Sequence, residues 1–325
     1  MRAGARALSL LVTPLNGELL GALEEGERAL SDLRCELGQP PATTLRKYLK
    51  GLTELGLIER RQEFGFPGPV SYAITPSGRG LLAVRGVLQR WLELAPGGPI
   101  TIESTAAKTA TKALVDGWSA GIVRALAARP LTLTELSKLI PRISYPTLER
   151  RLTAMRLSGQ LEANREKGAK GTPYCVTAWL QAAAAPLGTA VGWERRCIPS
   201  QATALASLDV EALLLLGVPA ASFPLDLSGS CRLAVELRGG SDPLHAGVVA
   251  TIREGRVVSC VTRLSEQADG WLVGSPMDWL HWLSGSSGCQ IEVGGDVQWA
   301  RRAAEGLQED VISRVRGMTA LSPTA

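Results

Sequence analysis

The sequence has little of the chemistry that most enzymes and metal sites need. Histidine occurs twice in 325 residues, at His245 and His281, and none of the six cysteines forms a CxxC pair or lies beside either histidine. The GxSxG, HExxH and P-loop patterns of common catalytic sites are also absent. We therefore expect neither an enzyme nor a cofactor-binding or metal-binding protein.

Long apolar runs are missing as well, since none approaches the ~18 residues of a membrane span. The first residues, MRAGARALSLLVTPLNG, are basic and then apolar, as in a signal peptide. Their apolar stretch, 8–12, is shorter than the ~7–15 residues of such a segment, and no small-residue cleavage site follows. The cysteines fit reduced thiols. We expect a cytoplasmic protein that has no membrane partner.

Charge is unevenly distributed along the chain. Residues 1–198 hold 26 Lys and Arg against 17 Asp and Glu, whereas residues 199–325 hold 9 against 14. A basic first part and an acidic second part indicate a polyanionic partner for the first part alone.

The first 198 residues read as two copies of one unit. A shift of 103 residues aligns Leu23 with Leu126, and it also aligns LSDL (30–33) with LTEL (133–136). Further matches at shifts of 103 and then 102 pair Thr44 with Thr147, Leu49 with Leu152, Gly56 with Gly159, Tyr72 with Tyr174, Thr75 with Thr177 and Trp91 with Trp193. So many matches in one order predict a tandem duplication.

Each copy has the parts of a winged helix-turn-helix. In copy one, helices are expected near residues 15–23, 28–37 and 41–55, with Gly56 ending the third in a left-handed conformation. A hairpin of 57–62 and 70–75 follows, and then a long helix over 76–94. Copy two repeats this order after the linker 95–104.

The third helix of copy one carries a basic face. With Leu45, Leu49 and Leu52 turned to the core, the opposite side holds only hydroxyl and cationic groups. Such a helix fits the major groove, where Arg, Lys and Thr reach base edges and phosphates. In copy two, Ser144 is expected to cap the corresponding helix and to suit a phosphate there. The predicted contacts with double-stranded DNA, hairpin residues included, are Thr43, Thr44, Arg46, Lys47, Lys50, Arg60, Arg61, Ser144, Tyr145, Thr147, Arg150, Arg151, Arg165, Lys167 and Lys170.

Copy one resembles the HxlR-type winged-helix transcriptional regulators. The resemblance rests on LNGELLGALEEGERALSDLRCELG, TTLRKYLKGLTELGLIERR and VSYAITPSGRGLL. It implies a DNA-binding regulator that contacts DNA through the third helix and the wing. Because such proteins commonly act as dimers, two copies in one chain would supply a pseudo-dimer that covers two half-sites. The family's N-terminal cysteine segment is not evident, so redox sensing is not carried over.

Residues 200–325 have a different character, with strands followed by helices. Four of the eight tryptophans lie between 271 and 299, which fits either an aromatic core or an apolar ligand cavity. The order of GWLVGSPMDWLHWL and IEVGGD resembles the sterol-carrier-protein fold, which implies a hydrophobic tunnel. The candidate lining residues are Trp271, Trp279, Leu280, Trp282, Leu283 and Trp299.

We therefore expect an α+β protein with two tandem winged helix-turn-helix domains, 1–95 and 105–198, and a sterol-carrier-like domain, 200–325. The leading hypothesis is a transcriptional regulator that responds to a hydrophobic small-molecule effector. The alternative is a protein that sequesters a hydrophobic molecule and uses its winged helices for protein contacts. The sequence leaves open whether the chain also forms a homodimer.

Overall fold

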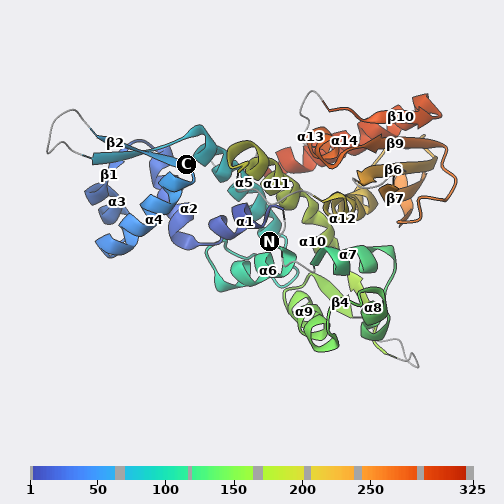
Figure 1. Ribbon diagram of the computed structural model, residues 1–325, viewed down its shortest axis with the longest axis horizontal. Coiled ribbons are helices and arrows are strands. Elements are labelled where there is room, and N and C mark those ends of the chain that lie inside the picture. The colour runs from blue at the N-terminus through green and yellow to red at the C-terminus, as the bar shows by residue number, and fades with distance from the viewer. Residues whose placement is uncertain are drawn as a thin grey trace.

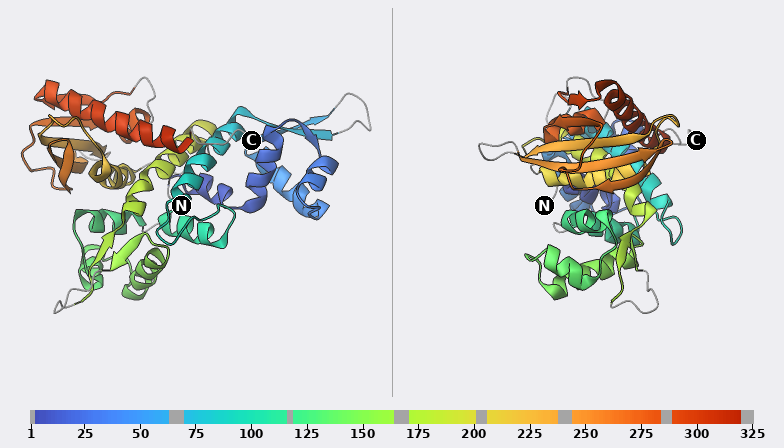
Figure 2. Two further views of the ribbon diagram at one scale, coloured as in Figure 1. Left: turned by 180° about the vertical axis from the view of Figure 1, so that it is seen from behind. Right: turned by 90° about the vertical axis from the view of Figure 1, so that its right-hand side faces the viewer.

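The computed structural model describes residues 3–62, 70–115, 119–163, 171–200, 206–237, 244–283 and 289–319. Three lobes surround a central pair of long helices (Figures 1 and 2). We call residues 5–93 the first lobe, residues 105–197 the second lobe and residues 207–319 the sheet lobe. The mixture of helices and sheets confirms the expected α+β class.

The first lobe is a winged helix-turn-helix. Its helices are α1 (Ala5–Leu11), α2 (Pro14–Glu24), α3 (Leu30–Glu36), α4 (Ala42–Glu54) and α5 (Pro76–Glu93). Its sheet has the order β1 (Arg28–Ala29), β3 (Val70–Ile74) and β2 (Ile58–Gln62). The second helix begins later than the expected residue 28, because Arg28 and Ala29 pair with Tyr72 and Ser71.

The second lobe has a similar order of elements. It contains α6 (Thr105–Val115), α7 (Ser119–Ala128), α8 (Leu133–Leu139), α9 (Tyr145–Leu157), β4 (Leu161–Ala163), β5 (Tyr174–Val176), α10 (Ala178–Ala182) and α11 (Ala184–Cys197). A single bridge between Leu131 and Tyr174 stands where β1 pairs with β3 in the first lobe. The last helix is split at Ala183, because Pro186 lacks an N–H and cannot bond to the carbonyl of Ala182.

Two threonines hold corresponding positions in these lobes. Thr75 Oγ1 lies 2.7 Å from the Gly56 carbonyl oxygen and accepts a bond from Gly78 N at 3.2 Å. Thr177 Oγ1 lies 2.9 Å from the Gly159 carbonyl oxygen and accepts from Leu180 N at 3.2 Å. Each hydroxyl therefore caps the helix that follows the wing and ties it to the end of the preceding helix.

The linker between these lobes is packed rather than loose. Ile102 is buried, and its N–H donates to Gln89 Oε1 at 3.0 Å, while Ile100 N donates to the Leu92 carbonyl at 3.1 Å. These bonds hold residues 100–102 on α5, because Gln89 and Leu92 both belong to that helix.

The sheet lobe places helices on a five-stranded sheet. Its strands have the order β10 (Glu292–Gly295), β9 (Gly270–Gly274), β6 (Gly229–Leu237), β7 (Leu244–Arg253) and β8 (Arg256–Val261). Its helices are α12 (Ser207–Gly217), α13 (Pro276–Leu283) and α14 (Val297–Thr319), with a 3-10 turn at Val218–Ala220. Strands β7 and β8 are joined by a turn in which both Glu254 and Gly255 have positive φ angles.

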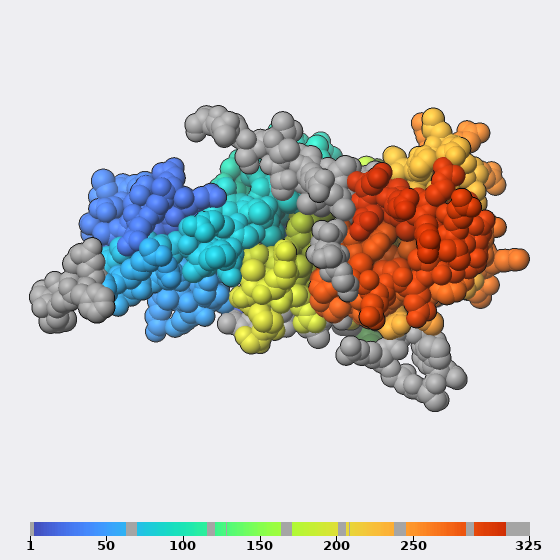
Figure 3. All heavy atoms as spheres, turned by 90° about the horizontal axis from the view of Figure 1, so that it is seen from above, coloured from blue at the N-terminus to red at the C-terminus, as the bar shows by residue number. Residues whose placement is uncertain are grey.

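The central helices α5 and α11 join the first two lobes. The rings of Trp91 and Trp179 stack with centroids 4.3 Å apart, and each indole N–H donates to the other residue's carbonyl. Trp193 on α11 donates to the Ser77 carbonyl at 2.9 Å. Figure 3 shows α5 and α11 filling the space between the first lobe and the sheet lobe.

The sheet lobe rests on helices of both other lobes. Helix α12 packs on α7, where the buried carboxylate of Glu211 is paired with Arg124 and also accepts from Gly247 N of β7 at 3.1 Å. Helix α14 packs on α5, and α13 packs on α11. A movement within the sheet lobe would therefore act on the helices that join the first two lobes.

Candidate nucleic-acid interface

Helix α4 presents the predicted basic face to solvent. Leu45, Leu49 and Leu52 are buried, and the opposite side exposes Thr43, Arg46, Lys47 and Lys50. Thr44 is half-buried. Lys50 Nζ lies 3.8 Å from Glu54, whereas Arg46 and Lys47 form no hydrogen bond or ion pair with any described residue. Two unpaired cations on one helix face suit phosphate or base contacts.

The helix ends where its sequence predicts. Gly56 has φ 68°, the left-handed conformation that glycine adopts without steric cost, and the N–H of Leu57 bonds to the Leu52 carbonyl. This closure directs the chain into β2, which carries the wing arginines.

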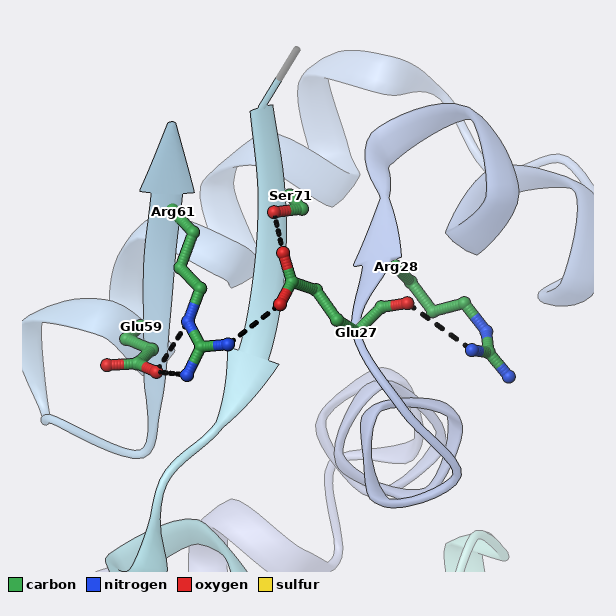
Figure 4. Close-up of polar contacts among 5 residues, drawn as sticks. All are labelled: Glu27, Arg28, Glu59, Arg61 and Ser71. Atoms are coloured by element: carbon green, nitrogen blue, oxygen red, sulfur yellow. Dashed lines mark hydrogen bonds and ion pairs between the residues drawn. The ribbon is translucent and has the colours of Figure 1, made fainter. Parts of the chain in front are cut away.

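The two wing arginines differ in their availability. Arg61 is held by Glu59 and by Glu27, with a distance of 2.8 Å from Arg61 Nη1 to Glu27 Oε2 (Figure 4). Glu27 also accepts from the Ser71 hydroxyl, and the bonds from Ser71 and Arg61 lower the pKa of the Glu27 carboxyl. Arg60 is exposed, and among the described residues its side chain contacts Gln62 alone, at 3.4 Å. Within the described part of the wing, Arg60 is therefore not paired with a carboxylate.

Sequence reasoning missed Glu27. The residue lies 34 positions before Arg61 and just before β1, and only the pairing of β1 and β2 with β3 brings the two side chains together. No local pattern signals that contact.

The corresponding helix of the second lobe, α9, is less basic at its surface. Leu148, Leu152 and Met155 are buried, as expected. Tyr145 and Arg150 are exposed and Thr147 is half-buried. Arg151 is also half-buried, at the position that Tyr48 holds in α4, and burial lowers the pKa of its guanidinium. Arg151 is therefore less exposed than the helical pattern predicts.

Ser144 does not cap α9 with its side chain as predicted. Its hydroxyl donates to Thr147 Oγ1 at 2.8 Å, and no backbone N–H of the helix bonds to it. The predicted wing contacts Arg165, Lys167 and Lys170 lie outside the described residues.

The candidate ligand residues of the sheet lobe do not form one set. Trp279 and Trp282 pack edge to face at 5.5 Å in the core, and the Trp279 indole N–H donates to the Ala234 carbonyl. Leu283 and Trp299 pack at the margin of that core, and the Trp299 indole N–H donates to the Ser228 carbonyl at 3.0 Å.

Trp271 and Leu280 lie elsewhere. Leu272 is buried in the core, so Trp271, the next residue of β9, lies on the other face of the sheet, against Gly294. Leu280 joins Ala3 and Val191 in a separate cluster that links α13 to α11. Strand alternation and helix docking thus separate residues that are close in sequence.

The described residues hold no group of His, Cys, Asp and Glu that could bind a metal ion. All six cysteines are free. Cys231 is buried, which raises the pKa of its thiol to about 12, whereas Cys35 is exposed. Within the described ranges, no helix is long and apolar enough to cross a bilayer.

Comparison with known proteins agrees with the geometry of the first lobe. Residues 16–95 match the family described as HxlR-like helix-turn-helix, whose members are DNA-binding regulators. No curated protein matches the chain. The matched residues run from within α2 to the end of α5 and include the basic face of α4 and the wing strands, so the similarity covers the part of the first lobe that holds the candidate DNA contacts.

Proposed function

We propose that this chain is a transcriptional regulator with two winged-helix lobes fixed as a pseudo-dimer and a sheet lobe that senses a hydrophobic small molecule. The observation that carries the DNA-binding part is the exposed, unpaired pair Arg46 and Lys47 on α4, within an HxlR-like domain. A helix with such a face suits the major groove.

A tandem duplication is supported by bonds at the centre of the molecule. Trp91 donates to the carbonyl of Trp179, and Trp193 donates to the carbonyl of Ser77. Trp193 follows Trp91 by the same 102 residues by which Trp179 follows Ser77. The bond from Trp193 to Ser77 is thus the bond from Trp91 to Trp179 with the two copies exchanged. Such reciprocal contacts are the signature of a two-fold interface.

The packing of the sheet lobe supports a sensing role. The rings of Trp279 and Trp282, both on α13, fill the apolar interior of the sheet lobe, and α13 contacts α11. A hydrophobic ligand that entered there would displace α13. The displacement would then shift α11, the last helix of the second lobe, because α13 packs on it. Such a ligand changes DNA affinity only as far as it favours one arrangement of the two lobes.

The DNA-binding part is tested with Arg46→Ala and Lys47→Ala. A loss of one phosphate contact should weaken binding to a 30-base-pair duplex and reduce the slope of log K against log salt by about 1. Fluorescence anisotropy at several salt concentrations measures both quantities. Arg301→Ala, which removes an exposed cation on α14, is the matched control. Affinity and slope equal to those of the control would exclude α4 as the contact surface.

The sensing part is tested separately with 1-tetradecanol as an uncharged apolar probe. Binding should change the emission of the buried tryptophans and shift the affinity for duplex DNA, and Trp282→Phe should alter the emission change. Tryptophan fluorescence titrations with and without duplex measure this coupling. An absence of binding would remove the sensing role and leave the DNA-binding test unaffected.

A further inference from the structure

A hollow of about 480 Å³ in the first lobe is lined by residues of α1, α2 and α4 and of the segments beside them. Arg6 and Leu10 of α1 line the hollow, as do Lys47 and Tyr48 of α4 and Leu55, the residue that follows α4. Its volume falls within the range of about 300–1,000 Å³ that holds small molecules. No sequence pattern predicts the hollow, because residues 1–17 show only a basic start and a short apolar stretch.

The hollow has an excess of positive charge. Neither Arg6 nor Lys47 forms a hydrogen bond or ion pair with any described residue. The one carboxylate in the lining, Glu54, already lies 3.8 Å from Lys50 Nζ. Two unpaired cations on opposite walls would both gain from an anionic group between them.

Apolar side chains complete the lining. Leu10 and Leu55 are half-buried and Leu52 is fully buried beneath them. A bare phosphate or a DNA backbone would leave this surface uncovered, whereas an organic acid would bury it. We propose that the hollow binds a small organic anion with an aromatic or branched apolar body, its carboxylate between Arg6 and Lys47.

The position of α1 gives this site a connection to the rest of the molecule. The N–H groups of Gly4 and Ala7 both donate at 2.9 Å to the buried carboxylate of Glu194 on α11. A ligand held between α1 and α4 therefore touches both the basic face and a helix anchored to the molecular centre. Because Lys47 would contact both the organic anion and duplex DNA, the two should compete for the protein. This competition alone rests on the proposed function.

Isothermal titration calorimetry of the full chain with 1-naphthoate, and with neutral 1-naphthamide as its isostere, tests the site without DNA. Naphthoate should bind at least tenfold more tightly than naphthamide. Arg6→Ala should weaken naphthoate about tenfold and leave naphthamide unchanged, while Arg301→Ala should match the unaltered protein. Equal binding of acid and amide, no binding of the acid, or equal effects of the two substitutions would overturn the proposal.

A second pair of variants tests the location without changing charge. Gly51 lines the hollow, and a Cβ there would meet no atom within 4 Å, so Gly51→Met should fill the space and abolish naphthoate binding. Gly86→Met is the control, because Gly86 on α5 also has open space around it. Naphthoate binding that survives in Gly51→Met as in Gly86→Met would place the ligand elsewhere. Inorganic phosphate at millimolar concentration should not displace naphthoate, and displacement would count against an organic anion.

Discussion

The arginines and lysines of the first lobe differ in whether their side chains are already paired with a carboxylate. Arg46, Lys47 and Arg60 have no carboxylate of the described chain within bonding distance, while Arg61 is shared by Glu59 and Glu27. All of these side chains are at the surface, so their pairing sets availability for DNA more than it sets stability. The wing is thus partly neutralised by its own carboxylates.

Glu27→Gln should strengthen DNA binding. The change removes a negative charge from the wing and frees Arg61 Nη1, so one more cation can neutralise a phosphate. We expect affinity for duplex DNA to rise severalfold and the salt slope to increase by about 1. Since its bonds lower the pKa of Glu27, the carboxylate stays ionised at neutral pH, and the effect should be full there.

Fluorescence anisotropy of Glu27→Gln against Glu305→Gln measures this effect. Glu305 is exposed on α14, so its substitution changes the net charge equally without touching the wing. Identical gains in the two variants would mean that the response comes from net charge alone and that Arg61 does not reach DNA.

At the scale of elements, the two helix caps offer a direct comparison between the first and second lobes. Thr75→Val and Thr177→Val each remove a hydroxyl that accepts a helix N–H and contacts two carbonyls of the preceding segment. The shape of the side chain is kept. Each substitution should lower the free energy of unfolding by about 1 kcal/mol.

Urea denaturation followed by circular dichroism measures both losses. Similar values are expected because the contacts correspond atom for atom. Thr109→Val, at a surface position whose hydroxyl bonds only to the Thr105 carbonyl of its own helix, is the control and should cost less. A large cost at one cap with none at the other would contradict an equivalent role in the two lobes.

Local patterns predicted the elements of the first lobe well. The leucines of α4, the glycine at its end and the wing strands all follow from interactions between residues near one another in the chain. The departures have tertiary causes. Strand pairing converts Arg28 and Ala29 from helix to β1, and packing half-buries Arg151 on α9.

The arrangement of the candidate ligand residues in the sheet lobe was less predictable for the same reason. Four tryptophans within 29 residues read as one cluster, but the alternation of β9 places Trp271 on the face opposite to Leu272. Leu280 and Trp279 are adjacent on α13 and yet face different neighbours. The neighbours of each side chain on β9 and α13 depend on how these elements pack against the rest of the lobe. Local sequence patterns do not predict that packing.

At the scale of the whole molecule, the two central helices set how the first and second lobes sit relative to each other. The stacked pair Trp91 and Trp179, together with the bond from Trp193 to Ser77, joins α5 to the helices of the second lobe by buried contacts. A separate dimer is free to dissociate, whereas this interface lies within one chain. The spacing between α4 and α9 is therefore set by covalent connection and by packing.

Together with the proposed function, this arrangement predicts that one chain binds one duplex with two half-sites. It also predicts that the affinity depends on the spacing between the half-sites. On a duplex selected by the protein from a random pool, inserting five base pairs between the half-sites rotates one by about half a turn. Affinity should then fall to that of a single half-site, and light scattering should give one chain per duplex. The double variant Trp91→Phe and Trp193→Phe removes two of the indole donors but keeps aromatic rings, so it should tolerate the insertion better. Two chains per duplex, or an equal penalty in the double variant, would show that the central helices do not set the spacing.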